Sequence, residues 1–389
     1  MPLGIYIHIP FCISKCAYCD FVSYAGRDNQ QAAYFNALIK EIRLKAATLD
    51  LGVNRKVRSI FFGGGTPSYV PTEYITQILS ELAYYFVLTP DCEITLEGNP
   101  ESLNSIPRIE TYRQSGINRI SIGTQSFDDH ILAIMHRPHK SDMITHTVQN
   151  VRAAGIDNFN LDLIFGYPEQ TQIQWKDALQ KALALKPSHL SLYGLTVEPN
   201  TRLDVQIRSK QLPEPDDDTS VSMYLEAEEE LSHQGYHHYE ISNWSLPSLE
   251  CQHNLNYWKF GNYLGFGLNA HSYLAGKRSW NTDNLNDYIH SLNSKKLPES
   301  DSEVLTGRHQ MAEYCMVTLR LREGIHRQTF ITRFGTDVVD AFGQVLHQYE
   351  STGMIEISPD YVRLTIQGIL FSDSIFSDLL SDTDFSENE

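Results

Sequence analysis

Three cysteines stand close together near the start of the chain, in the run His8-Ile9-Pro10-Phe11-Cys12-Ile13-Ser14-Lys15-Cys16-Ala17-Tyr18-Cys19. Their C-x3-C-x2-C spacing supplies three thiolates and no fourth. Soft sulfur ligands at this density suit an iron–sulfur cube, in which each cysteine holds one corner iron. A four-iron cube with three protein ligands keeps one iron open to a small chelating molecule. The spacing therefore predicts a [4Fe-4S] cluster on Cys12, Cys16 and Cys19 that takes part in chemistry.

Two simpler interpretations of these cysteines stay open. A structural zinc site usually combines two ligand pairs separated by a dozen or more residues, and His237 and His238 are the available second pair. The other is three buried cysteines without a ligand. A disulfide is not expected, because six cysteines in 389 residues are too dilute for a secreted scaffold. The N-terminus does not resemble a signal peptide, so we expect a reducing, cytoplasmic setting.

Composition limits the classes of partner. The formal net charge of −17 argues against nonspecific nucleic-acid binding, which needs a surplus of lysine and arginine. No stretch approaches the 18 or so apolar residues that a membrane span requires. At 41% hydrophobic residues, the chain can bury a sizeable core and is long enough for one large and one small domain.

The elements that must position the cysteines alternate between short apolar strands and longer helices. The expected strands are Gly4–Ile9, Ser59–Phe62, Glu93–Glu97, Arg119–Gly123, Phe159–Ile164 and His189–Tyr193. Strands that alternate with helices of ten or more residues predict a parallel sheet with right-handed crossovers. Six such β/α units are too few for a closed eight-stranded barrel, so we expect a partial, three-quarter barrel.

Polar and glycine-rich segments follow five of these strands, where a parallel barrel builds its site. They are the cysteine loop, Gly63-Gly64-Gly65-Thr66-Pro67, Glu97-Gly98-Asn99-Pro100-Glu101, Thr124-Gln125-Ser126-Phe127 and the segment from Asp162 to Pro168. Any one of them alone is typical of an ordinary turn. Together they predict one shared pocket next to the cysteine loop.

The cysteine spacing resembles the signature of the radical S-adenosylmethionine (SAM) superfamily. In that family the open iron chelates the amino and carboxylate groups of SAM, and an electron from the cluster cleaves the sulfonium bond to give a deoxyadenosyl radical. The triple glycine matches the family element that holds the methionine amino group. Tyr6-Ile7-His8-Ile9-Pro10-Phe11-Cys12, Gly63–Pro67, Gly123–Phe127 and Leu161–Pro168 together resemble the oxygen-independent coproporphyrinogen III dehydrogenase (HemN) family over nearly the whole chain. The resemblance implies a SAM site formed by Tyr6, Gly64, Gly65, Thr66, Glu97, Gln125, Arg137 and Asp162.

Two features separate the chain from the dehydrogenases. They carry an additional cysteine two residues after the third ligand, where this chain has Phe21, and an N-terminal extension before the first motif. In addition, Cys251-Gln252-His253-Asn254-Leu255-Asn256-Tyr257-Trp258 resembles the H-N-x-x-Y-W element of the HemW branch, whose members are regarded as heme chaperones. A neutral imidazole from His253 is a good axial ligand for heme iron, and Tyr257 and Trp258 offer aromatic surface for a porphyrin. Cys251 is the rival axial ligand.

The resemblance and the sequence pattern divide the chain into three parts, and we expect Lys295–Asp301 to be a linker before the last one. The three parts are a radical-SAM partial barrel over 1–235, a barrel extension with the heme-binding element over 236–299, and a small winged-helix-like α+β module over 300–389. In the last part a helical stretch precedes a hairpin of Ile355–Ile357 and Val362–Leu364. Its acidic last helix favours a packing role over DNA binding.

The leading hypothesis is a heme chaperone that holds a [4Fe-4S] cluster, SAM and heme and transfers heme to an acceptor protein. A cellular electron donor would reduce the cluster. The alternatives are an oxygen-independent coproporphyrinogen III dehydrogenase and a radical SAM enzyme for another substrate. Phe21 and the H-N-x-x-Y-W run favour the chaperone over the dehydrogenase, and whether the chain is an enzyme at all stays open.

Overall fold

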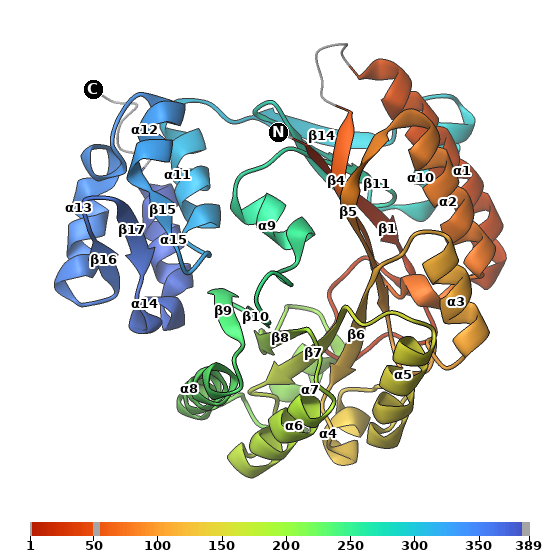
Figure 1. Cartoon of the computed structure of the whole chain (residues 1–389), viewed down its shortest axis with the longest axis horizontal. Helices are drawn as coiled ribbons and strands as arrows, with labels where there is room; N and C mark the ends of the chain where they lie inside the picture. The colour runs from red at the N-terminus through yellow and green to blue at the C-terminus, as the bar shows by residue number, and fades with distance from the viewer. Residues whose placement is uncertain (1, 50–54, 383–389) are drawn as a thin grey trace.

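The computed structural model describes residues 2–49 and 55–382, and its central feature is an open sheet of twelve strands. The strand order is β14-β13-β12-β11-β1-β4-β5-β6-β7-β8-β10-β9. All neighbours from β11 through β8 pair in parallel, and the strands outside this run pair antiparallel. The sheet curves without closing, because β14 and β9 lie at opposite ends of it (Figure 1). This is the expected partial β/α barrel.

The six strands expected from the sequence are confirmed, each within a few residues of its predicted bounds. They are β1 (Leu3–Ile9), β4 (Lys56–Gly64), β5 (Val87–Gly98), β6 (Arg119–Gln125), β7 (Phe159–Phe165) and β8 (His189–Gly194). Most residues of the central strands are buried, because helices cover one face of the sheet and other chain segments cover the other. In β6, for instance, six of the seven residues are buried. The face away from the helices also carries polar residues, such as Asn160 and Asp162 of β7.

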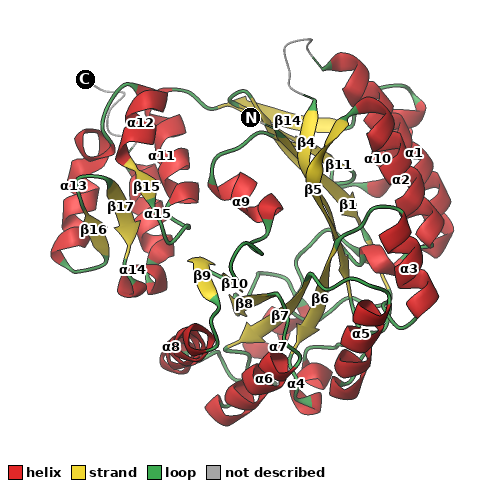
Figure 2. Cartoon of the chain, in the orientation of Figure 1, coloured by secondary structure: helices red, strands yellow, loops and turns green. Residues whose placement is uncertain are grey.

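Helices cover the convex face of the sheet (Figure 2). They are α1 (Gln31–Thr48), α2 (Thr72–Tyr85), α3 (Ile106–Gln114), α4 (Asp129–Ile134), α5 (Ser141–Ala153), α6 (Gln172–Ala184) and α8 (Asp217–His233), with α10 (Leu285–Asn293) beside α1. In α2 the buried residues Ile75, Ile78, Leu79 and Leu82 repeat at helical spacing and form the stripe that packs inward. Thr171 and Gln174 close a capping box at the start of α6.

Short strands that the sequence did not predict extend both edges of the sheet. They are β9 (His237–Glu240), β10 (Asn243–Ser245), β11 (Tyr263–Phe266), β12 (His271–Leu274), β13 (Lys277–Asn281) and β14 (Glu299–Val304). The segment Lys295–Asp301 looks like a linker in the sequence, but that expectation is wrong in its second half, where β14 begins. The polar composition of β14 is that of an edge strand, which pairs on one side only and carries no hydrophobic signal. Residue 300, the expected boundary of the last part, lies within this strand.

Helix α9 (Gln252–Trp258) lies on the concave side of the sheet, between the sheet and the C-terminal elements (Figure 1). It contacts β4 and also α11. The short helix α7 (Arg202–Arg208) follows β8 and belongs to a small separate apolar cluster with the cysteine loop, through Leu203 and Ala17.

The C-terminal elements form the smaller unit that the sequence predicts. They are α11 (Gly307–Thr318), β15 (Ile325–His326), α12 (Arg327–Phe334), α13 (Val338–Ser351), β16 (Ile355–Ile357), β17 (Tyr361–Leu364), α14 (Ile366–Leu370) and α15 (Ser372–Ser381). The expected hairpin is present as β16 and β17, which β15 extends to three strands. Residues 383–389 of the predicted third part lie outside the described residues. Within the described ranges, none of the helices has the length and apolar character needed to cross a bilayer.

Candidate functional site

The cysteine loop is fastened to the end of the parallel sheet by backbone hydrogen bonds. Cys12 ends β2 (Phe11–Cys12), which pairs in parallel with β3 (Tyr24–Ala25) and so brings the two ends of the loop together. Farther along, Ala17 N donates to Met135 O at 3.0 Å. Cys12, Cys16 and Cys19 are all free and partly buried, and they line one cavity of about 390 Å³.

Two side chains from other segments, one after β4 and one after α4, donate hydrogen bonds to the cysteine sulfurs. Thr66 Oγ1 donates to Cys12 Sγ at 3.5 Å, and Arg137 Nη1 donates to Cys16 Sγ at 3.2 Å. Burial raises the pKa of Cys12 to about 11 despite the hydrogen bond from Thr66. Donors of this kind stabilise thiolates once a metal has replaced the proton.

The arrangement of the sulfurs bears on the zinc alternative. Three thiolates on one Zn²⁺ lie about 2.3 Å from it and so within about 4 Å of one another. Among residues 2–49 and 55–382, no group of three or more His, Cys, Asp or Glu side chains is arranged to hold a metal ion. The described residues therefore add no support for zinc, and the cluster stays a prediction from the spacing of the three cysteines, which line one cavity.

The residues predicted for SAM binding lie around the same cavity with one exception. The cavity lining includes Gly64, Gly65, Thr66, Glu97, Gln125, Arg137 and Asp162. Tyr6 instead lines a second cavity, and its hydroxyl is hydrogen-bonded to His8 Nδ1 at 3.1 Å. The strand ends therefore bring together the three cysteines and seven of the eight predicted residues.

The glycines serve the packing of the cysteine loop. A Cβ on Gly64, which has φ +107°, would lie 2.5 Å from the ring of His8. A Cβ on Gly65 would lie 2.8 Å from the backbone oxygen of Phe11, and Gly65 N donates to Ile9 O at 2.8 Å. The chain needs glycine here so that β4 can approach the strand that leads into the cysteine loop.

Two partly buried carboxyl groups, those of Glu97 and Asp162, line the cavity. Burial, together with the charge of Asp162, raises the pKa of Glu97 to about 8. The pKa of Asp162 is also raised by burial, although Asn160 Nδ2 donates to its carboxylate at 2.7 Å. Two acids that resist ionisation together favour a cationic guest, because a positive charge between them offsets their repulsion. The sulfonium and amino groups of SAM are cations of this kind.

Buried polar atoms without a partner point to the same conclusion. Within the described part of the chain, Gln125 Oε1 and Arg137 Nε are buried and have no hydrogen-bond partner. Gln125 also adopts a left-handed backbone with φ 63°, a strained conformation that is common at ligand sites. An acceptor and a donor left open in a cavity are what a ligand with amino, carboxylate and hydroxyl groups would satisfy. The residues present therefore fit a three-cysteine cluster with SAM.

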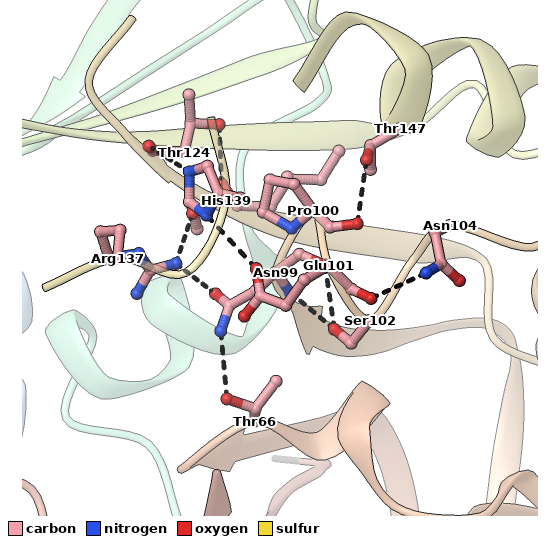
Figure 3. Close-up of polar contacts among 12 residues, drawn as sticks. Thr66, Asn99, Pro100, Glu101, Ser102, Asn104, Thr124, Arg137, His139 and Thr147 are labelled. Carbon is pink, nitrogen blue, oxygen red and sulfur yellow. Dashed lines mark hydrogen bonds and ion pairs between the residues drawn. The ribbon is translucent and has the colours of Figure 1, made fainter. Parts of the chain in front are cut away.

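Asn99, which the sequence analysis did not select, is hydrogen-bonded to both Arg137 and Thr66 (Figure 3). These are the two side chains that donate to the cysteine sulfurs. Arg137 Nη2 donates to Asn99 Oδ1 at 2.7 Å, and Asn99 Nδ2 donates to Thr66 Oγ1 at 3.1 Å. Arg137 Nη2 also donates to Gly123 O at 2.7 Å. The Asn99 amide thus orients one donor for Cys12 and one for Cys16. Its position after the third strand was the only signal that sequence offered.

A second cavity of about 530 Å³ lies next to the first, and Asp20 and Phe21 line both. Its wall is mainly aromatic. The rings are those of Tyr6, Tyr257, Trp258, Phe260, Tyr263 and Tyr273. Helix α11 contributes Met316 and Glu313, the latter paired with Arg278 at 2.6 Å. Cofactor pockets of proteins are commonly of this size and apolar character.

His253, the predicted heme ligand, lines neither cavity. It is 1% exposed, and its ring stacks on Phe61 with 5.2 Å between centroids. Both ring nitrogens are in hydrogen bonds, Nδ1 with Ser59 Oγ at 3.0 Å and Nε2 with Tyr257 OH at 2.8 Å. Burial lowers its pKa to about 3, so the imidazole is neutral. The assignment of His253 as a heme ligand stays a prediction, and Tyr257 connects it to the second cavity.

Glu93 on β5 holds the start of α9, a role that the sequence did not reveal. Its carboxylate accepts from Gln252 N at 3.1 Å and His253 N at 3.2 Å, the first backbone donors of the helix. The Cys251 thiol donates to the same carboxylate at 3.5 Å, and burial raises the pKa of Cys251 to about 12. The rival heme ligand is therefore a protonated thiol that is 1% exposed. A buried carboxylate at a helix N-terminus is stabilised by the helix dipole.

Comparisons with known proteins agree with this geometry. Residues 6–182 match the Radical SAM superfamily, and residues 305–371 match the HemN C-terminal domain. The chain is 32% identical to heme chaperone HemW of Bacillus subtilis, over 97% of this chain and 99% of that protein. It is 34% identical to heme chaperone HemW of Haemophilus influenzae, over 98% of each. Among solved structures, coproporphyrinogen III oxidase (HemN) from Escherichia coli superposes with a TM-score of 0.85 at 22% identity, over 98% of this chain and 90% of that one. The last similarity concerns the fold alone.

Proposed function

Because this chain belongs to the HemW family of radical SAM proteins, we propose that it binds heme and passes it to an acceptor protein. The observation that carries the proposal is the pair of adjoining cavities that share Asp20 and Phe21. One contains the thiols and polar groups for a cluster with SAM. The other has flat aromatic walls suited to a porphyrin face. Phe21, which is 63% exposed, stands at their common border.

In this proposal Cys12, Cys16 and Cys19 hold a [4Fe-4S] cluster, and the remaining cavity residues hold SAM. The bound cluster and SAM would supply one-electron chemistry. Thr66 and Arg137 donate to the thiolates and temper their charge. The carboxyl groups of Glu97 and Asp162 attract the cationic part of SAM, and the open acceptor of Gln125 takes one of its donors.

Heme is the cargo, and the second cavity is where we place it. The acceptor protein and the electron donor that reduces the cluster are further partners of this proposal. A reducing setting is supported by the six cysteines, all of which are free thiols. The sequence-based choice of His253 as the iron ligand requires that one of its two hydrogen bonds break.

The proposal is tested with the full chain reconstituted anaerobically with iron and sulfide. Hemin titration followed by the Soret band should show saturable binding of one heme. The loaded protein should transfer heme to an apo heme protein faster than free hemin or loaded albumin does. The Cys12→Ala/Cys16→Ala/Cys19→Ala variant is compared with Cys92→Ala, which removes a buried cysteine away from both cavities.

The competing function is tested with the same preparation. SAM, a strong reductant and coproporphyrinogen III are added, and decarboxylated porphyrinogen is measured beside a known dehydrogenase. We expect no product. Product that disappears in the triple cysteine variant would make the chain a dehydrogenase and overturn the proposal, as would the absence of saturable heme binding. Equal transfer by the triple variant would remove the role of the cluster but leave the heme-binding part.

A further inference from the structure

The second cavity contains histidines in two different states. His8 and His271 both line it, on β1 and at the start of β12. His8 is 5% exposed, its Nε2 is hydrogen-bonded to Val22 O at 2.9 Å and its Nδ1 to Tyr6 OH. A ring whose two nitrogens are both engaged has no lone pair free for a metal.

His271 differs from His8 in the surroundings of its ring. In the part of the chain that the structure describes, its ring contacts are with Trp280, at 5.7 Å between centroids and nearly parallel, and no hydrogen bond of its nitrogens is formed. Trp280 is its direct cross-strand neighbour on β13 and fixes the plane of the imidazole. His271 is also the more exposed of the two histidines, so an incoming ligand can reach it.

Two further polar groups of the cavity wall lack a partner. Tyr273 is 5% exposed, and its hydroxyl is buried without a hydrogen bond. The indole Nε1 of Trp258 is buried without one as well, within the described residues. Buried donors in native proteins are almost always paired. Two open donors in an aromatic cavity indicate a guest that is flat and apolar and carries acceptors at its edge.

We propose that an iron porphyrin occupies this cavity and that His271, rather than His253, ligates its iron. The inference rests on the proposed function, because it takes heme as the cargo. The rings of Tyr257 and Tyr263 would face the macrocycle, and Tyr273 and Trp258 would donate to its carboxylates. His271 and Tyr273 project to the same face of β12, since they are two residues apart.

The charges around His271 favour ligation. Burial and then the charge of Arg278 lower the pKa of His271, so that the ring is neutral and can bind iron at neutral pH. Arg278 itself is paired with Glu303 at 3.3 Å and with Glu313 at 2.6 Å, so these acids already compensate its charge, and Asp20 adds a further carboxylate to the wall. The carboxylates of the porphyrin therefore have to lie away from these acids, next to the open donors of Tyr273 and Trp258.

The test uses the full chain and its heme spectrum. His271→Gly should abolish the histidine-ligated spectrum and weaken hemin binding about tenfold or more. Substituting even a residue that only hydrogen-bonds a metal ligand commonly lowers metal affinity by about that factor. Added imidazole should restore the spectrum, because it fills the space that the substitution opens. His253→Gln should keep the histidine-ligated spectrum. The matched control is His347→Ala, which removes an exposed histidine of α13. His271→Gln replaces His271→Gly if the glycine variant unfolds at a lower temperature than the wild type.

The outcomes separate this inference from the proposed function. If wild-type protein shows no saturable hemin binding, the proposed function fails and the inference with it. If wild type binds heme and His271→Gly is unchanged while His253→Gln loses the spectrum, the inference is overturned and the sequence-based ligand stands. If His271→Gly is as stable as wild type and loses the histidine-ligated spectrum, but added imidazole does not restore that spectrum, the result also counts against ligation by His271. Tyr273→Phe should weaken binding roughly 2- to 12-fold without lowering stability, and an unchanged affinity would remove that residue from the site.

Discussion

Replacing Asn99 by alanine should damage the cluster site although Asn99 does not touch a cysteine. Its amide accepts from Arg137 at 2.7 Å and donates to Thr66 at 3.1 Å, and these two residues donate to Cys16 and Cys12. Without the amide, the Thr66 hydroxyl is free to rotate away from Cys12. Arg137 Nη2 then still donates to Gly123 O.

The magnitude follows from the bonds that are lost. A hydrogen bond from a charged donor contributes about 1.5–3 kcal/mol, and a neutral one about 0.5–1.5 kcal/mol. Because Arg137 keeps its bond to Gly123, the charged contribution lies at the low end of its range. We expect Asn99→Ala to lower the free energy of unfolding of the apoprotein by about 2–3 kcal/mol. Asn99→Asp keeps the acceptor for Arg137 and should cost only about 0.5–1.5 kcal/mol.

The two variants should behave alike toward the cluster, because both lose the donor to Thr66. An aspartate even offers the Thr66 hydroxyl a new acceptor in competition with Cys12 Sγ. After anaerobic reconstitution, both should contain less iron and sulfide per chain than wild type and lose iron faster to a chelator. Asn104→Ala is the matched control: its side chain also donates one hydrogen bond, to Glu101 O at 3.0 Å, but it is exposed and away from the thiols.

Asn99→Ala and Asn104→Ala are compared by two measurements. Urea unfolding of the apoprotein gives the stability difference, and iron content gives the effect on the site. If Asn99→Ala matches Asn104→Ala in both, the amide does not orient the donors and the reasoning is refuted. If Asn99→Ala loses stability but holds its cluster as wild type does, Thr66 and Arg137 donate to the cysteine sulfurs without being oriented by Asn99.

Three other substitutions test the ionisable groups that the fold buries. Glu93→Gln should lower the free energy of unfolding by about 1–3 kcal/mol, because it weakens the cap of α9 and leaves buried Arg119 without its neighbouring charge. Urea denaturation measures this difference, and Glu73→Gln, which changes an exposed acid at the start of α2, is the control. Burial holds the pKa of His8 at about 4 and that of His253 at about 3, below their usual 6.5, so protons bind the unfolded chain first and stability should fall as pH drops below 6.5. His253→Gln should flatten that fall, and an unchanged slope would contradict the burial argument. Burial holds the pKa of Glu97 at about 8, above its usual 4.5, so its contribution is lost as pH rises from 4.5 to 8; Glu97→Gln should flatten the pH dependence of apoprotein stability in that window, measured by denaturation at several pH values.

The strand-end residues were predictable because one rule governs them all. Parallel strands end at the same edge of a sheet, so residues that follow successive strands meet there whatever their separation in sequence. This brings Gly64, Glu97, Gln125 and Asp162 to the cavity of Cys12. The rule concerns position and leaves side-chain contacts undetermined.

The missed residues show what that rule leaves out. Asn99 stands in an expected segment, but its hydrogen bonds depend on where Thr66 and Arg137 point after the strands have ended. Glu93 was counted as part of a strand, and its partner α9 lies about 160 residues later in the chain. Tyr6 was assigned to SAM by the family resemblance, and the structure places it on the wall of the second cavity. That cavity could not be foreseen, because the edge strands β11 to β13 that help to build it are short and partly polar and were not predicted.

The origin of the two cavities explains why a fold shared with an enzyme does not by itself establish an activity. The cluster cavity comes from the ends of the parallel strands and the loop of Cys12, and a change there would affect any radical SAM chemistry. The second cavity is formed largely by α9, by the edge strands with His271 and by α11 with Glu313, outside the six β/α units. Substitutions in those elements alter what lies beside Phe21 while the strand ends stay as they are. Cargo can therefore change between relatives that keep one sheet, and function has to be argued from the second cavity and its residues.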